Sequence, residues 1–286
     1  MISDITLGQF FPGFSPLHKL DPRTKIILAV LFIVAVFLVN NPVGFLMLTI
    51  FTAFLVAISR ISFKVVLRGI KPIFFILIFT SLINLFMTSG NSEPLVSFWI
   101  IKIYKEGIIR AIFMSLRVIV LIIGTSMFLT YTTSPISLTD GIESLLKPLK
   151  KIGVPVHLFA MMMTIALRFI PTLVEETEKI MNAQKSRGAD FSSGGLIKRA
   201  KALIPILVPL FVSSFKRAEE LATAMECRCY RGDKNRTKYV ELKYKPIDFC
   251  WLFFSLTLFV GIILLRILPY EFNINNFIYK LVFYRI

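Results

Sequence analysis

Two similar stretches of this sequence, Glu178–Phe191 and Glu219–Gly232, each carry an arginine near the end. The stretches align so that Arg187 falls on Arg228. A guanidinium is permanently charged, and its planar fork pairs with a carboxylate or phosphate through two parallel hydrogen bonds. One arginine at a helix end is most simply a cation near the negative end of the helix dipole. The repetition favours another interpretation, in which two equivalent arms each present one anion-binding side chain.

Small residues flank both arginines. Ser186 and Gly188 surround the first, and Cys227 and Cys229 surround the second. Small side chains let the backbone or groove of another protein approach the guanidinium closely. Two copies also match a partner with two equivalent subunits, each of which would receive one arm. We therefore predict that both segments dock onto a protein with paired subunits.

The composition is that of a membrane protein. Of 286 residues, 56% are hydrophobic and 28 are Phe, which is far above the apolar fraction of an ordinary soluble domain. A helix needs about 20 apolar residues to cross a bilayer, or about 17 at the short end. Five apolar runs approach or meet this length: Ile26–Val39, Val43–Ile58, Ile73–Met87, Ile108–Leu129 and Ile247–Leu268. The sequence predicts an all-α membrane protein with about five transmembrane helices.

The positive charge predicts how the chain is oriented. The formal net charge is +16, and 26 of the 33 Lys and Arg residues lie within residues 19–25, 60–71 and 132–245. Five spans place these regions on one side, which the positive-inside bias identifies as the cytoplasm. The N-terminus is then cytoplasmic, while the loop Ser89–Glu106 and the tail from Pro269 are external. Anionic lipid accounts for most of the charge, whereas scattered basic residues without a motif do not favour nucleic-acid binding.

The character of the chain changes after Tyr131. Ser137–Lys151 is short and amphipathic, which is typical of a helix lying in the membrane interface. Val156–Arg187 and Leu196–Tyr230 are long helical patterns, each apolar in its first half and charged in its second. The apolar part of the second pattern, Leu203–Phe215, covers only about 20 Å and is too short to cross. We expect these two helices to pack together and to project their C-terminal ends into the cytoplasm.

Three domains follow from this pattern. Residues 1–131 form a membrane domain with four transmembrane helices, and residues 132–246 form a cytoplasmic and interfacial coupling domain. Residues 247–286 form the last transmembrane helix and the external tail. Two polar residues outside the coupling domain have structural interpretations: Asp21 precedes Pro22 as a helix N-cap, and Arg117 lies deep enough in its span to face protein rather than lipid.

Taken together, these motifs resemble the transmembrane T component of bacterial energy-coupling factor (ECF) transporters, a branch of the ATP-binding-cassette (ABC) importers. The resemblance covers nearly the whole chain and is most specific in Ser15–Lys25, in Pro155–Phe191 and in the two small-Arg-small motifs. In that family the motifs read Ala-Arg-Gly at the tips of two crossed coupling helices. Each arginine there engages an acidic residue of one of two cytoplasmic ATPase subunits, which implies this role for Arg187 and Arg228.

The resemblance also implies a second partner, a membrane-embedded S component that binds the substrate, a vitamin or other micronutrient. The surface expected to contact it contains soft or bulky apolar side chains: Phe159, Met161, Met162, Met163, Leu167, Leu207 and Phe211. The same methionines could instead fill the space between helices. One departure from the family is Cys229 in place of Gly, which leaves open whether the backbone there adopts a positive φ.

The chain has no G-x-x-x-x-G-K-[ST] loop for phosphates, so ATP would be bound by the partners, and we expect neither catalysis nor a cofactor or metal. An intramembrane enzyme is one alternative, because Glu175 and Glu176 followed by Lys179 faintly match the Glu-Glu-x-x-x-Arg motif of CAAX-type proteases. The basic residue differs, however, and His18 and His157 are the only histidines. A self-contained secondary transporter is another alternative, which would need converging polar groups near the midplane.

Overall fold

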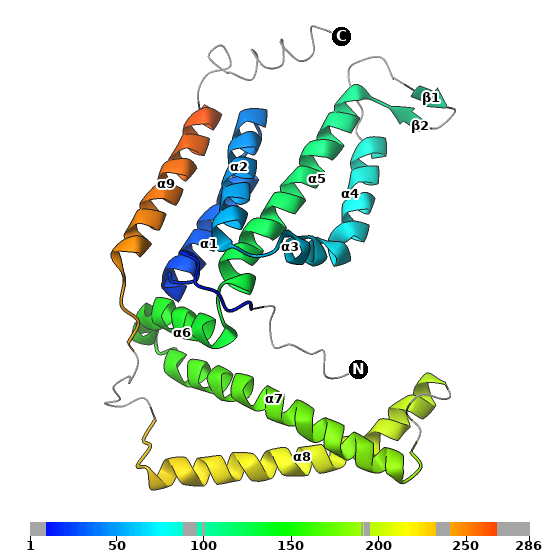
Figure 1. Cartoon of the computed structure of the whole chain (residues 1–286), viewed down its shortest axis with the longest axis vertical. Coiled ribbons are helices and arrows are strands. Elements are labelled where there is room, and N and C mark those ends of the chain that lie inside the picture. The colour runs from blue at the N-terminus through cyan, green and yellow to red at the C-terminus, as the bar shows by residue number, and fades with distance from the viewer. Residues whose placement is uncertain are drawn as a thin grey trace. The chain divides into compact units, whose positions relative to one another are not determined.

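The computed structural model describes residues 10–87, 96–98, 101–189, 191, 195–232 and 241–267. Figure 1 shows long helices and one short hairpin, β1 (Val96–Phe98) with β2 (Ile101–Ile103). The α-helices are α1 (Pro22–Leu38), α2 (Pro42–Ser59), α3 (Phe63–Ile70), α4 (Phe74–Met87), α5 (Lys105–Thr125), α6 (Pro135–Leu146), α7 (Val156–Ser186), α8 (Leu196–Cys227) and α9 (Pro246–Ile267). Short non-α turns are η1 (Lys71–Ile73), η2 (Ser126–Tyr131) and η3 (Lys147–Ile152). The predicted all-α membrane fold is confirmed.

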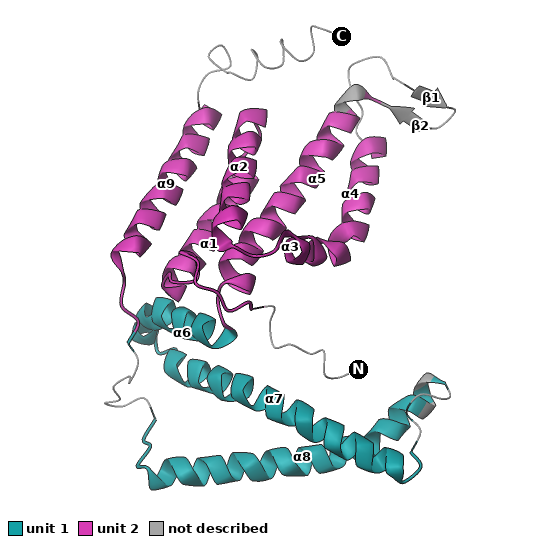
Figure 2. Cartoon of the chain, in the orientation of Figure 1, with its two compact units in different colours: residues 1–9, 135–241 teal, residues 10–134, 242–286 magenta. Residues whose placement is uncertain are grey.

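The chain divides into two compact units, coloured separately in Figure 2. One contains residues 1–9 and 135–241, and we call it the coupling unit because it includes α7 and α8. The other contains residues 10–134 and 242–286, and we call it the membrane unit. The predicted assignment of domains to membrane and cytoplasm stays a prediction. The external tail from Pro269 and residues 89–95 of the external loop lie outside the described residues.

Among the described residues, five helical segments are long and apolar enough to cross a membrane. Four contain predicted spans, namely α2, the segment from α3 through α4, the segment from Gly107 to Tyr131, and α9. The fifth differs from the prediction. It is the 31-residue α7, whose first half is apolar, whereas the predicted first span forms α1 with only 17 residues. Seventeen helical residues cover about 26 Å, close to the short limit for a crossing.

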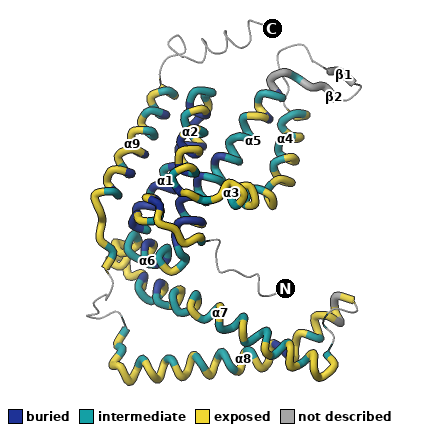
Figure 3. Tube along the Cα trace, viewed as in Figure 1, coloured by how far each residue is buried: buried dark blue, intermediate teal, exposed yellow. Residues whose placement is uncertain are grey.

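Aromatic packing holds the membrane unit together. The Phe32 ring of α1 lies 6.0 Å from the Phe51 ring and 6.2 Å from the Phe128 ring, centroid to centroid. Gly124 of α5 lies so close to Phe32 that any Cβ at this position would overlap the ring. The absence of a side chain there lets α5 approach α1 closely. Figure 3 shows the buried positions concentrated in this part of the unit, with α4 mostly exposed.

Buried charges join three segments of the membrane unit. The side chain of Asp21 accepts from the backbone N–H of Arg23 at 2.9 Å, which confirms the predicted N-cap. Asp248 is fully buried at the start of α9 and accepts from the backbone N–H of Asp21 at 2.8 Å. Lys25 donates from Nζ to the carbonyl of Thr132 at 2.7 Å. Because each of these buried charges has a partner, the network fixes the chain entering α1 against the start of α9 and the end of η2.

Arg117 joins α5 to the turn between α1 and α2. Its guanidinium donates to the carbonyl of Val39, the C-cap of α1, and to Oδ1 of Asn40 at 3.3 Å. It also lies 5.1 Å from the centroid of the Phe45 ring. A cation is favourable at the negative end of a helix, and the aromatic face adds a second attraction. The expectation that Arg117 faces protein is confirmed, and its role is to hold the end of α1.

We predict that Arg117→Met destabilises the protein by about 1.5–3 kcal/mol, because hydrogen bonds to a charged group are lost and the Val39 carbonyl is left without its donor. Thermal unfolding of the detergent-solubilised protein measures this change. Arg110→Met, two turns earlier on α5 and exposed, is the matched control and should have little effect. Equal shifts for the two variants would contradict the role assigned to Arg117.

Candidate functional site

The first arginine lies at the end of α7 in a turn that closes the helix. Arg187 is the C-cap, and Gly188 follows with φ of +86°. The N–H of Gly188 donates to the carbonyl of Lys185 at 2.9 Å, and the N–H of Ala189 donates to that of Gln184 at 3.0 Å. These two bonds define a Schellman motif, which satisfies the last carbonyls of a helix and needs a left-handed residue after the cap. The turn therefore fixes the point at which Arg187 leaves the helix.

The second arginine lies in the same turn at the end of α8. Arg228 is the C-cap, and Cys229 follows with φ of +56°. The N–H of Cys229 donates to the carbonyl of Glu226 at 2.8 Å, and the N–H of Tyr230 donates to that of Met225 at 3.0 Å. In the alignment that places Arg187 on Arg228, each donor and acceptor falls on its counterpart in the first turn. The open question about Cys229 is thus answered: the positive φ is retained without glycine.

Both ends are open to solvent within the coupling unit. The exposed residues are Ser186, Arg187, Gly188, Cys227, Arg228 and Cys229. Neither guanidinium is part of an ion pair among the described residues. The arrangement offers two accessible cations in matched backbone settings, which suits recognition of carboxylate or phosphate.

An ion pair connects the two helices before their ends. Arg217 of α8 donates from Nη2 to Oε2 of Glu176 on α7 at 2.7 Å, and Ser213 donates from Oγ to Oε1 of Glu176 at 2.6 Å. Both carboxylate oxygens therefore have partners on the opposite helix. The predicted packing of the two long helices against each other is confirmed, but this contact was not predicted. A signal existed, since Glu176 and Arg217 are opposite charges at equivalent positions of the repeat.

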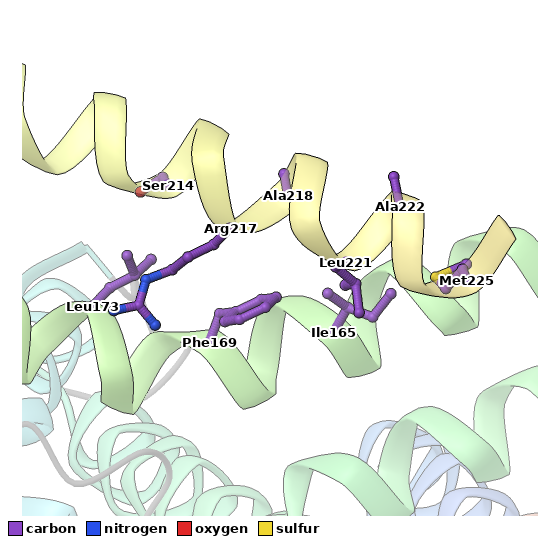
Figure 4. A pocket seen from close by; sticks show the side chains of 9 residues that line it. All are labelled: Ile165, Phe169, Leu173, Ser214, Arg217, Ala218, Leu221, Ala222 and Met225. Carbon is purple, nitrogen blue, oxygen red and sulfur yellow. The ribbon is translucent and has the colours of Figure 1, made fainter. Parts of the chain in front are cut away.

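An apolar groove of about 280 Å³ lies beside this ion pair, between α7 and α8. Ile165, Phe169 and Leu173 line it from α7, and Ala218, Leu221 and Met225 line it from α8. Figure 4 shows Arg217 reaching from α8 toward Leu173 at one end of the groove. The two helices are thus joined by polar bonds at one point and packed incompletely beside it.

The residues predicted to contact the S component differ in how far their side chains are exposed. Phe159, Met162, Met163, Leu207 and Phe211 are exposed, whereas Met161 and Leu167 are half-buried. The Met161 sulfur accepts from the hydroxyl of Tyr230 at 3.3 Å. Because Tyr230 follows the second arginine turn, this bond joins the first part of α7 to the end of α8.

The described residues do not group three or more His, Cys, Asp or Glu side chains as a metal site would require. The two histidines have local partners. His18 bonds Ser15 and the carbonyl of Phe11, and His157 bonds Glu143 of α6 through Nδ1 at 3.0 Å. Each ring therefore has a structural explanation in its own unit.

Comparisons with known proteins agree over most of the chain. Residues 13–239 match a family model described as cobalt transport protein. A Clostridium kluyveri protein named energy-coupling factor transporter transmembrane protein EcfT is 55% identical over 267 residues, covering 93% of this chain and 98% of that protein. A protein of the same name from Ruminiclostridium cellulolyticum is 57% identical over 248 residues, covering 87% of this chain and 92% of that protein. Another from Bacillus subtilis is 49% identical over 249 residues, covering 87% of this chain and 93% of that protein.

The matched turns predict opposite effects of glycine at two neighbouring cysteines. Cys229→Gly should stabilise the end of α8 by about 1 kcal/mol, because a side chain in the left-handed region is strained. Cys227→Gly should destabilise it by about 1 kcal/mol, because Cys227 is the last helical residue. Amide hydrogen exchange at Tyr230 measures both effects. It should be about fivefold slower in Cys229→Gly and about fivefold faster in Cys227→Gly than in the wild type.

Gly188→Ala is the control for the first turn and should speed exchange at Ala189, although no atom lies near enough to clash with the added Cβ. Effects of the same sign for Cys227→Gly and Cys229→Gly would contradict the assigned turn.

Proposed function

Since the chain belongs to the family of energy-coupling factor transporter transmembrane proteins, we propose that it couples two cytoplasmic ABC-type ATPase subunits to a membrane-embedded S component. The substrate carried by the S component would be a vitamin or another micronutrient. The observation that carries this proposal is the pair of exposed arginines in matching turns at the ends of α7 and α8.

Each arginine docks onto one ATPase subunit. A carboxylate in a groove of that subunit would receive the guanidinium through two parallel hydrogen bonds. Ser186, Gly188, Cys227 and Cys229 leave room for the groove walls. The matching turns support this role, because two equivalent subunits are best served by two equivalent contacts.

ATP is bound by the partners. The chain itself lacks the glycine-rich loop that cradles nucleotide phosphates. ATP binding draws the two ATPase subunits together, and the docked arginines follow. The crossed helices then change their angle, and an S component resting on their apolar faces is reoriented in the membrane.

The exposed apolar side chains of α7 and α8 support the contact with the S component. Phe159, Met162 and Met163 are each more than half exposed, and Phe211 is 63% exposed. Methionines adapt to differently shaped partners because their side chains are flexible and polarisable. A subunit that serves several S components would benefit from such a surface.

The membrane location is supported by the five apolar helices, and we propose the plasma membrane of a bacterial cell. The N-terminus would face the cytoplasm and the C-terminus the outside. With α1 counted as a span and α7 as a coupling helix, the three regions rich in basic residues fall on one side, which supports this orientation.

The two alternatives lack an observation in their favour. For an intramembrane protease, Glu176 would have to be available for chemistry, but both its oxygens accept hydrogen bonds from α8. For a secondary transporter, the deep Arg117 would be a candidate substrate ligand, but it bonds the end of α1.

We predict that Arg187→Glu or Arg228→Glu weakens co-purification of the ATPase subunits and abolishes ATP-driven uptake, with a greater loss in the double variant. Loss of one partner of a buried charge pair commonly costs about 2–5 kcal/mol. Lysine should rescue only in part, since the planar fork is absent. The measurements are co-purification in mild detergent and uptake in proteoliposomes.

Lys201→Glu is the matched control, because it makes the same charge change at an exposed position near the start of α8. It should leave both readouts unchanged. Undiminished uptake by the Arg187→Glu, Arg228→Glu double variant would rule out the proposed docking.

A further inference from the structure

The bond between Glu176 and Arg217 joins two positions that are equivalent in the repeat, just as Arg187 is equivalent to Arg228. We propose that Glu176, Arg217 and Ser213 form the pivot about which α7 and α8 turn during transport. This inference rests on the proposed function, and it adds the residues that convert movement of the arginine ends into movement of the membrane-proximal ends.

The repeat itself indicates where the pivot lies. When two similar segments are related by a two-fold axis, a contact between residues i and j recurs as a contact between j and i. A residue of one segment can contact the equivalent residue of the other only close to this two-fold axis. Glu176 and Arg217 are equivalent in the repeat, and Oε2 of Glu176 lies 2.7 Å from Nη2 of Arg217. The two-fold axis that relates the two helices therefore passes beside them.

The chemistry of the contact suits a pivot. Glu176 receives one bond from Arg217 and one from Ser213, which lies one turn earlier on α8. Two bonds from neighbouring turns of α8 hold both oxygens of the carboxylate. Rotation about this point also requires the bond between Tyr230 and Met161, which joins the end of α8 to the first part of α7, to break. The ion pair is partly sheltered, with side-chain exposures of 22% for Glu176 and 38% for Arg217, and therefore competes better with water than a fully exposed pair.

Packing beside the pivot leaves room for rotation. Phe169 of α7 and Leu221 of α8 both line the groove of about 280 Å³, whereas a close-packed helix interface would resist a change of angle through interlocked side chains. Among the side chains of the two helices that the structure describes, only Val156, Ala160 and Ile206 are buried. The apolar side chains between the helices are mostly half-buried, and the polar bonds at Glu176 add a specific contact.

The position of the pivot sets the lever lengths. Arg187 and Arg228 each lie about 16 Å of helix beyond it (176 to 187 and 217 to 228). The starts of α7 and α8 lie about 30 Å before it (156 to 176 and 196 to 217). Rigid arms would therefore move about twice as far at their membrane-proximal ends as at the arginines.

Charge exchange tests the identity of the pivot. Glu176→Arg and Arg217→Glu alone should each lower substrate transported per ATP hydrolysed by about tenfold, because like charges then meet. ATPase co-purification should stay within about twofold of wild type. The double variant restores an ion pair between equivalent positions and should recover coupling to within about threefold. Glu175→Gln, at the neighbouring exposed position, is the control and should behave as wild type.

Distance measurements test the lever. Spin labels at Asn182 and Thr223 lie about 9 Å along their helices from the pivot, toward the arginine ends. Labels at Leu158 and Arg199 lie about 27 Å along the same helices in the opposite direction, toward the helix starts. Each pair occupies equivalent positions of the repeat. The background is the full complex with every Cys of this chain replaced by Ser. On adding a non-hydrolysable ATP analogue, both distances should change in the same direction, and the change for the Leu158–Arg199 pair should be about threefold larger.

The outcomes separate this inference from the proposed function. A wild-type chain that carries no ATPase subunits overturns both. A coupled wild-type complex in which the charge-exchanged double variant is no better than the single variants overturns the pivot alone. So does a complex in which the distance between positions 182 and 223 changes while that between 158 and 199 does not, because the helices would then bend at Pro171, Pro205 or Pro209.

Discussion

The contact of Glu176 with Ser213 and Arg217 is the interaction on which the coupling unit depends most. The helices α7 and α8 contain 31 and 32 residues, yet only three of the side chains that the structure describes in them are buried. Hydrophobic contact between them rests mainly on half-buried side chains such as Phe169, Leu173 and Leu221. The crossing of the helices sets the separation of the arginines at their ends, and the hydrogen-bonded carboxylate is a specific contact at that crossing.

The membrane unit is built on the opposite principle. Its core contains closely packed aromatic rings, a glycine that lets α5 approach Phe32, and the buried charges of Asp21, Lys25 and Asp248, each of which has a partner. Close packing of this kind resists gradual deformation. A transport subunit needs both kinds of construction, because a rigid frame gives the bilayer a fixed surface while loosely packed helices can change their angle at low cost.

Sequence patterns predicted the long helices well and their contacts poorly. Apolar runs and the Asp21 cap depend on neighbouring residues, so the length of the apolar runs was sufficient to find α2, α5 and α9. The contact between Glu176 and Arg217 depends on the crossing of two helices, which no local pattern specifies. Arg117 could be predicted to face protein, but its partner Val39 is a backbone carbonyl without a sequence signal. The first span was predicted by hydrophobicity alone and formed a helix of only 17 residues.

The turn after Arg228 has the same backbone geometry as the turn after Arg187, although a different residue type occupies the left-handed position. Gly188 reaches a positive φ without strain, whereas Cys229 reaches one at a cost of about 1–2 kcal/mol. The same two hydrogen bonds close both turns, so they offset this cost in α8. A turn that is formed with and without glycine cannot owe its shape to glycine alone. The shape follows from the two backbone hydrogen bonds that close each helix behind its arginine, and the function we propose requires the same turn at both ends.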